Sequence, residues 1–334
     1  MAQHFLLRAN SRTLSLKEIF RMTDEEAFDT MKDMRWEDGK PVCPKCGGMT
    51  HYFLAARRIW KCAKRGCYKQ FSVTSGTLFS SHKLPLQDYL AAIAIFSNSA
   101  KGHSALQMSR DLDVQYRTAF VLVHKLREAI INGTDTSPLE GEVELDGSYF
   151  GGYTKPANRK ADRKDRRKPV NQNGNKRCVL LLREKDGNRS FAHVIRSENQ
   201  LDITPIVCNS VSPDALIHAD EHSGYDALGK FFATVRVSHS VQYSDASNGA
   251  CINLCESFFS RMLRCHLGQH HHISPKYLVQ YAREMAFRED TRRESNGSIF
   301  KMILGRAMKS PVSPEWCGYW QGNHRTWDGL SGVN

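Results

Sequence analysis

The chain has 334 residues, of which 40% are hydrophobic, so it is long enough for two or three domains with a sizeable core. It contains no run of about eighteen apolar residues and opens with no signal segment, which excludes a membrane span and makes the cytoplasm the expected location. The formal net charge of +12 indicates a polyanionic partner, most often nucleic acid.

Residues 1–40 are expected to form an N-terminal helical segment. Within it, Thr23 is followed by acidic residues and then by apolar residues at helical spacing, which predicts an amphipathic helix with an N-cap over residues 23–36. The apolar side of this helix would carry Ala27, Phe28, Met31, Met34 and Trp36.

Four of the ten cysteines form two pairs within residues 41–80, namely Cys43 with Cys46 and Cys62 with Cys67. Short strand-like stretches, HYFL and RRIWKC, lie between the pairs. This spacing predicts a zinc ribbon whose four thiolates bind one Zn²⁺, although four unrelated cysteines would be the simpler interpretation. The remaining six are expected to be buried thiols, since a cytoplasmic chain rarely holds disulfides: Cys178, Cys208, Cys251, Cys255, Cys265 and Cys317.

Residues 81–135 show three helical patterns, at about 85–98, 103–112 and 115–131. A tight turn precedes the last of them, and its first residues, Gln115, Tyr116 and Arg117, are polar or aromatic and suited to exposure. This arrangement resembles a helix-turn-helix, whose final helix enters the major groove of DNA. The alternative is an ordinary helical packing domain.

After a turn-rich boundary at residues 132–140, five strand-like segments alternate with helices up to about residue 300. The order is three strands, helix, strand, helix, strand and then two helices. It predicts an α/β, RNase H-like domain with a mixed five-stranded sheet. Residues 301–334 form a C-terminal tail without a clear period, and the sequence leaves open whether it packs on the core or serves a partner.

A basic segment, residues 155–177, separates the first two strands. It carries ten Lys or Arg residues against two Asp. It has no apolar period, so an extended loop is expected. A solvated surface would explain the charge, but the single sign next to the first strand favours contacts with phosphate groups. The residues expected to make them are Arg163, Lys164, Arg166 and Arg167.

Three carboxylates occupy corresponding places in this predicted domain. Asp146 lies in the first strand, Asp220 ends the fourth, and Glu256 lies on the helix after the fifth. The first and fourth strands of such a sheet are neighbours, so the three acids would converge. Such a cluster can hold two divalent ions, Mg²⁺ or Mn²⁺, for phosphodiester chemistry. Exposed surface acids are the alternative.

Several long stretches resemble one known family. They include FSVTSGTLF, SALQMSRDLDVQYRTAFVLVHKLREA, GEVELDGSYFGGY, PANRKADRKDRR and NLCESFFSRMLRCHLGQHHHISPKYLVQYAREMAFRED. From about residue 3 to residue 296 the chain resembles bacterial insertion-sequence transposases of the ISXO-like group, the family numbered fifteen-ninety-five. The resemblance implies a DDE-type catalytic domain, a zinc ribbon, and cutting and joining of DNA at inverted repeats.

Position by position, the resemblance implies that Asp146 and Asp220 are the first two catalytic acids. The third place is open between Asn253 and Glu256, which lie one helical turn apart. Glu256 is the better Mg²⁺ ligand because it is anionic. The family tends to place a basic residue seven after the Glu. This chain has Leu263 there, flanked by Arg261 and Arg264. Either an adjacent arginine contacts DNA instead, or the element has decayed.

The resulting hypothesis is a DNA transposase, located in the bacterial cytoplasm at the nucleoid, that binds element ends and target DNA. Two ends must be joined, so a dimer or larger assembly is expected. Two rivals stand beside it: an RNase H-like nuclease or resolvase without strand transfer, and a DNA-binding regulator without enzymatic activity.

Overall fold

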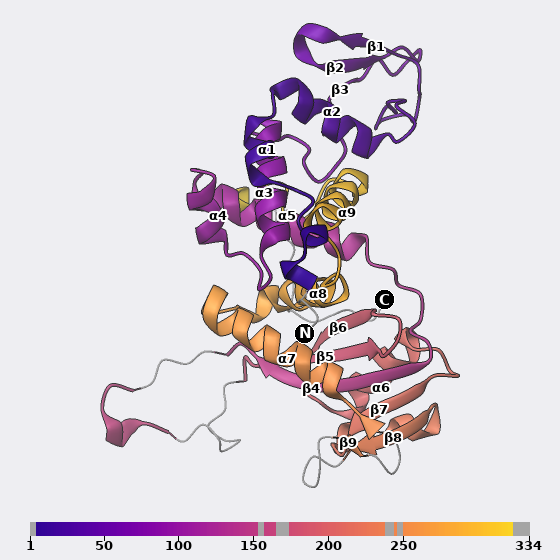
Figure 1. Cartoon of the computed structure of the whole chain (residues 1–334), viewed down its shortest axis with the longest axis vertical. Helices are drawn as coiled ribbons and strands as arrows, with labels where there is room; N and C mark the ends of the chain where they lie inside the picture. Colours follow the sequence, from indigo (N-terminus) through magenta and orange to yellow (C-terminus); the bar gives the residue numbers. More distant parts are fainter. Residues whose placement is uncertain (1–4, 153–156, 165–173, 238–243, 246–249, 323–334) are drawn as a thin grey trace. The chain divides into compact units, whose positions relative to one another are not determined.

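The structure is a computed structural model that describes residues 5–152, 157–164, 174–237, 244–245 and 250–322. The chain forms two compact units (Figure 1). The N-terminal unit comprises the described residues up to Thr134 together with those from Thr291 onward. The second unit is the intervening segment, Asp135–Asp290.

The N-terminal unit begins with helices α1 (Leu16–Arg21) and α2 (Asp24–Arg35) and a small antiparallel sheet. The strands are β1 (His51–Leu54), β2 (Ile59–Cys62) and β3 (Gln70–Phe71). The predicted N-cap of α2 is confirmed, because Thr23 and Glu26 form a capping box that satisfies backbone N–H groups of the first turn. The buried Trp60 of β2 packs on Phe28 and Trp36, which joins α2 to the sheet.

Four further helices complete this unit: α3 (Leu86–Asn98), α4 (Ala105–Asp111), α5 (Tyr116–Asn132) and α9 (Asn296–Lys309). The first three follow the predicted helices closely. Helix α9 packs against α2, α3 and α5. The boundary expected at residue 300 therefore falls inside a helix, and that helix belongs to the N-terminal unit.

The described part of the C-terminal tail packs on α5. The ring of Trp316 stacks on His124 at 4.4 Å, and Trp320 donates from Nε1 to the carbonyl of Arg117 at 3.1 Å. Trp316 is almost fully buried, since only 1% of it is exposed. Of the two roles that the sequence left open for the tail, packing on the core is the one that residues 313–321 adopt.

The second unit is built on the mixed five-stranded sheet expected from the sequence, in the order β6-β5-β4-β7-β8. Its strands are β4 (Glu142–Phe150), β5 (Arg177–Glu184), β6 (Ser190–Ile195), β7 (Leu216–Asp220) and β8 (Ala233–Val237). Strands β4, β5 and β6 form an antiparallel meander, while β7 and β8 run parallel to β4. A small ladder joins β9 (Ser244–Asp245) to β10 (Ala250–Cys251).

Helices cover both faces of this sheet. Helix α6 (Gln200–Ser210) packs on the face formed by Val143 and Leu145 of β4. Helices α7 (Asn253–Cys265) and α8 (Leu278–Asp290) cover the opposite face, and Figure 1 shows α7 lying across the strands. Because strand residues alternate between faces, Glu144 and Asp146 point to the side of α7 and α8.

Three details differ from the expectations or extend them. The helix predicted between β7 and β8 is a 3₁₀-helix, Ser223–Lys230. The expectation that all six later cysteines are buried was wrong for three of them: Cys208 on α6 is exposed, and Cys251 and Cys317 are half-buried. Cys178, Cys255 and Cys265 are buried as expected. Among the described residues, no helix is long and apolar enough to cross a membrane.

Candidate active site

Asp146 and Asp220 lie side by side on neighbouring strands. The parallel register of β4 and β7 pairs Leu145 with Ala219, so the next residues, the two aspartates, stand at the same level. Both belong to the sheet face that α7 covers, since Leu145 and Ala219 face the core on the other side. The sheet therefore brings together the two acids that the sequence placed in separate strands.

Glu256 lies in the first turn of α7 and is half-buried. This helix has no capping side chain of its own, because its N-cap residue is Ile252. Instead, Oε2 of Glu144 on β4 accepts the backbone N–H groups of Leu254 at 2.8 Å and Cys255 at 3.1 Å. Glu144 is fully buried. A carboxylate from the strand that carries Asp146 thus fixes the end of the helix that carries Glu256.

The charges of these acids act on one another. Burial, as the largest cause, and the neighbouring carboxylates of Asp220, Glu198 and Glu256 together raise the pKa of Asp146 to about 7. A hydrogen bond from Gly147 N–H, at 2.8 Å, acts in the opposite direction. The raised pKa therefore reflects a half-buried carboxyl group with further acids close to it.

One carboxylate oxygen of each aspartate accepts a hydrogen bond from a nearby backbone N–H group. Oδ1 of Asp146 accepts the N–H of Gly147, and Oδ1 of Asp220 accepts the N–H of His222 at 2.9 Å. Within the described ranges, neither forms an ion pair with Lys or Arg. No three of the site's carboxylates bring oxygens within 4.8 Å of one another among the residues that the structure describes. The acids therefore form an open cluster in which each aspartate keeps one oxygen for a ligand.

Glu198, in the loop between β6 and α6, is a fourth carboxylate of this cluster. Its carboxylate accepts the phenolic O–H of Tyr225, and its backbone N–H donates to the phenolic oxygen of Tyr149 at 2.9 Å. A Cβ atom at Gly147 would lie 2.5 Å from Oε1 of Glu198, so only glycine permits this approach next to Asp146. The carboxylate also raises the pKa of Tyr225, after burial, and keeps that phenol protonated.

Asn253, the other candidate for the third place, is the first residue of α7 and is exposed. Glu256, the alternative candidate, is among the groups that raise the pKa of Asp146.

The two arginines further along α7 have intramolecular partners. Arg261 pairs with the buried Glu289 of α8, and Arg264 donates to the hydroxyl of Ser260 at 2.7 Å.

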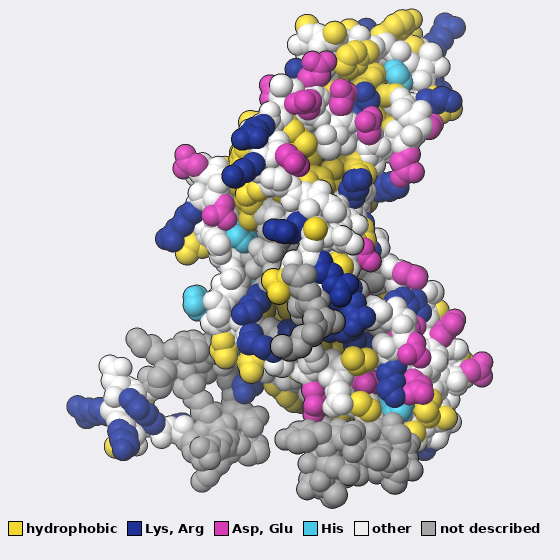
Figure 2. All heavy atoms as spheres, viewed as in Figure 1, with side chains coloured by type: hydrophobic (Ala, Val, Ile, Leu, Met, Phe, Trp, Pro, Cys, Tyr) yellow, Lys and Arg dark blue, Asp and Glu magenta, His cyan; other side chains and the backbone are white. Residues whose placement is uncertain are grey.

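The remaining residues expected to bind DNA lie at several places. Gln115 and Tyr116 are exposed at the start of α5. Arg117 is also exposed, and its guanidinium lies over the ring of Trp320 at 5.2 Å. Arg163 and Lys164 are exposed after a short 3₁₀ turn, Lys160–Asp162, where Figure 2 shows a group of Lys and Arg side chains at the surface. Arg166 and Arg167 lie outside the described residues.

The four ribbon cysteines come together as the sequence predicted. Their sulfur atoms lie within 4.8 Å of one another, with Cys43 and Cys67 at 3.8 Å and Cys46 and Cys62 at 3.6 Å. A tetrahedral Zn²⁺ with Zn–S bonds of about 2.3 Å requires S–S separations of about 3.8 Å. The cysteine cluster therefore fits a zinc ribbon.

A mixed sheet in this order, with acids on neighbouring strands and a zinc-ribbon cysteine cluster in the same chain, is consistent with a transposase of the DDE type. Residues 138–290 match the model of the ISXO2-like transposase domain, and residues 22–70 match the model of the transposase zinc-ribbon domain. The chain belongs to the family of ISXO2-like insertion-sequence transposases, as its sequence motifs predicted. No curated protein matches it.

The sequence did not reveal the parts played by Glu144 and Glu198. The alternation of β4 was a usable signal for Glu144, because it puts this residue on the same face as Asp146. Glu198 lies in a loop without a motif, so only the tertiary structure could place it beside Gly147.

Proposed function

We propose that this transposase acts on the DNA of its own element by hydrolysis followed by strand transfer. Water attacks the phosphorus at the element end, the 3′ oxygen leaves, and the freed 3′-OH then attacks a phosphodiester of the target DNA while the target's 3′ oxygen leaves. The observation that supports this best is that Asp146 and Asp220 stand at the same level of neighbouring strands and that Asp220 and Glu256 both raise the pKa of Asp146.

The donor set fits divalent cations. Hard carboxylate oxygens suit Mg²⁺ or Mn²⁺, and a carboxyl group whose pKa is raised by neighbouring acids gains most, as an anion, from a divalent cation beside it. Asp146, Asp220 and Glu256 would hold the ions. Bound there, the ions would activate the attacking oxygen and stabilise the leaving one.

Residues around the three acids would support them. Glu144 would hold the first turn of α7, and with it Glu256, against β4. Tyr225 would hold Glu198, which would add negative charge beside Asp146. Asn253, exposed one turn before Glu256, would contact DNA or serve as a secondary ligand.

Binding of the inverted repeats would fall to the N-terminal unit, with Gln115, Tyr116 and Arg117 at the start of α5. Phosphate contacts would come from the basic segment through Arg163, Lys164, Arg166 and Arg167. Arg261 and Arg264 on α7 would approach the DNA near the acids, Arg261 after exchanging its pairing with Glu289. Joining of two ends would require a dimer or a larger assembly on DNA.

The test uses a duplex that carries the element end, incubated with the full chain and Mg²⁺ or Mn²⁺ and scored separately for binding, nicking and joining. Asp146→Asn and Asp220→Asn should each abolish nicking and joining but keep binding, because an amide preserves shape and removes the charge. If both variants still cut, the acids are not the catalytic groups. If the wild-type protein binds without cutting, the regulator interpretation holds.

A further inference from the structure

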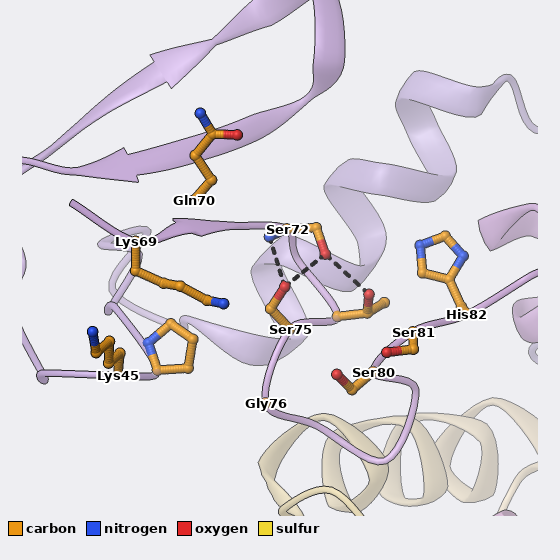
Figure 3. A pocket seen from close by; sticks show the side chains of 11 residues that line it. Lys45, Lys69, Gln70, Ser72, Ser75, Gly76, Ser80, Ser81 and His82 are labelled. Atoms are coloured by element: carbon orange, nitrogen blue, oxygen red, sulfur yellow. Dashed lines mark hydrogen bonds between the residues drawn. The ribbon is translucent and has the colours of Figure 1, made fainter. Parts of the chain in front are cut away.

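The N-terminal unit contains a hollow of about 540 Å³ beside the zinc ribbon. It lies between the first cysteine knuckle and the loop that follows β3. Figure 3 shows the Lys69 side chain directed toward Ser72 and Ser75, with Lys45 on the same wall and His82 on the opposite one. Five hydroxyl-bearing residues line it, and its lining includes no acid: Ser72, Thr74, Ser75, Ser80 and Ser81.

Both lysines are available to a ligand. They are exposed, and within the part of the chain that the structure describes neither Lys45 nor Lys69 forms an ion pair or a hydrogen bond through its ammonium group. Two such cations on one wall are matched best by an anion.

A third cation lies beneath the loop. Arg35 donates from Nη1 to the carbonyl of Val73 at 2.5 Å and from Nη2 to that of Ser75 at 2.6 Å. Burial lowers its pKa to about 10, so it remains charged at neutral pH. In the described structure its hydrogen bonds go to carbonyl groups and to no carboxylate. Its positive charge is therefore not neutralised locally and adds to that of the lysines.

The hydroxyl groups supply donors. Ser72 Oγ lies 3.1 Å from both Thr74 Oγ1 and Ser75 Oγ, so three hydroxyls share two mutual hydrogen bonds. Three hydroxyl protons serve two such bonds, which leaves one O–H to donate to a ligand. Within the described ranges, Ser80 and Ser81 have no side-chain partner either.

The cysteine cluster of the ribbon lies next to both lysines. Lys45 lies inside the knuckle formed by Cys43 and Cys46, and Lys69 follows Cys67 by two residues. The knuckle packs on the loop at Gly76, which has φ +82°, and a Cβ atom there would lie 2.8 Å from Pro44. Zinc bound by the cysteines would therefore fix both lysines opposite the hydroxyl groups.

From these interactions we infer that the hollow is a binding site for a phosphate group of the DNA backbone, with Lys45 and Lys69 as its cations. This inference rests on the proposed function, since it assigns a part of the DNA interface to a place that sequence motifs do not indicate. Backbone phosphates carry no sequence information, so the site contributes affinity on any duplex and does not select the element end.

The test measures binding of a labelled duplex of arbitrary sequence to the full chain by fluorescence anisotropy at several salt concentrations. Lys45→Ala combined with Lys69→Ala should lower the slope of log K against log salt by roughly 0.9 for each duplex phosphate that these lysines neutralise. The matched control is Lys17→Ala combined with Lys301→Ala, two exposed helical lysines outside the hollow, which removes the same charge. The charge-preserving pair Lys45→Arg and Lys69→Arg should keep the wild-type slope.

Zinc content, measured on every variant, reports that the ribbon is folded. If the wild type binds and the Lys45/Lys69 variant has the same slope as the control, the hollow binds no phosphate, and the proposed function still stands. Inorganic phosphate at millimolar concentration and constant ionic strength should compete with the duplex for the hollow, so it should weaken duplex binding by the wild type more than by the Lys45/Lys69 variant. Equal weakening of both would contradict the inference. If the wild type binds no duplex at all, both this inference and the proposed function are wrong.

Discussion

Asp146→Asn should make the metal-free catalytic unit more stable at alkaline pH. The folded state holds the proton of this carboxyl up to a pKa of about 7, whereas in the unfolded chain the pKa returns to 3.8. Between these values the folded state binds more protons than the unfolded one, so the free energy of unfolding falls as the pH rises. At 1.36 kcal/mol per tenfold change in affinity, the penalty above pH 7 reaches about 4 kcal/mol.

The experiment follows unfolding of the full chain at pH 4 and at pH 8 without added divalent cations, for the wild type and the variant. The amide cannot titrate, so the variant should gain up to about 4 kcal/mol over the wild type at pH 8 and little at pH 4. Added Mg²⁺ should then stabilise the wild type, by about 2.7 kcal/mol at one hundred times its dissociation constant, and leave the variant unchanged.

A suitable control is Asp214→Asn, which changes an exposed acid of the same unit and should alter neither result. The reasoning is refuted if Asp146→Asn is less stable than the wild type at pH 8 without metal. It is also refuted if Mg²⁺ stabilises both proteins equally, because the carboxylate would then not bind the ion.

Three further outcomes are expected. Elemental analysis should find about one zinc per wild-type chain and clearly less in Cys62→Ser, and full zinc retention would argue against a four-cysteine site. Glu144→Ala leaves two N–H groups of α7 without an acceptor, so it should lower the free energy of unfolding by about 1–3 kcal/mol for each group and should reduce cleavage. Glu144→Gln should have a smaller effect on both. Both variants should bind DNA normally. Arg163→Ala with Lys164→Ala should weaken all duplexes alike in a salt titration, and a weakening confined to the inverted repeat would contradict a phosphate role.

Periodicity predicted most of the fold because the local signals agreed with the tertiary structure. The alternation in β4 and the capping pattern at Thr23 are both present as expected. The sequence did not predict helix α9, because the helix crosses residue 300, where the tail is expected to begin. Its packing against α2, α3 and α5 joins segments far apart in the chain, and local patterns do not indicate such contacts.

The site was only partly predictable for the same reason. Asp146 and Asp220 are recognisable because each lies in or at the end of a strand, and strand order determines that they meet. The cap that Glu144 provides to α7 joins residues 110 positions apart, and the hollow at Lys45 and Lys69 depends on a knuckle packing against a loop. Single-sequence patterns carry no signal for such long-range packing.

The central claim, that the acids join DNA strands as well as cut them, is tested most directly with an element end supplied already cleaved and bearing a free 3′-OH. Incubated with the wild-type protein, Mg²⁺ and a target duplex, this end should become covalently joined to the target, and Asp220→Asn should give no joined product. Nicking of an intact end by the wild type, without any joining of the pre-cleaved one, would contradict the account and identify a nuclease.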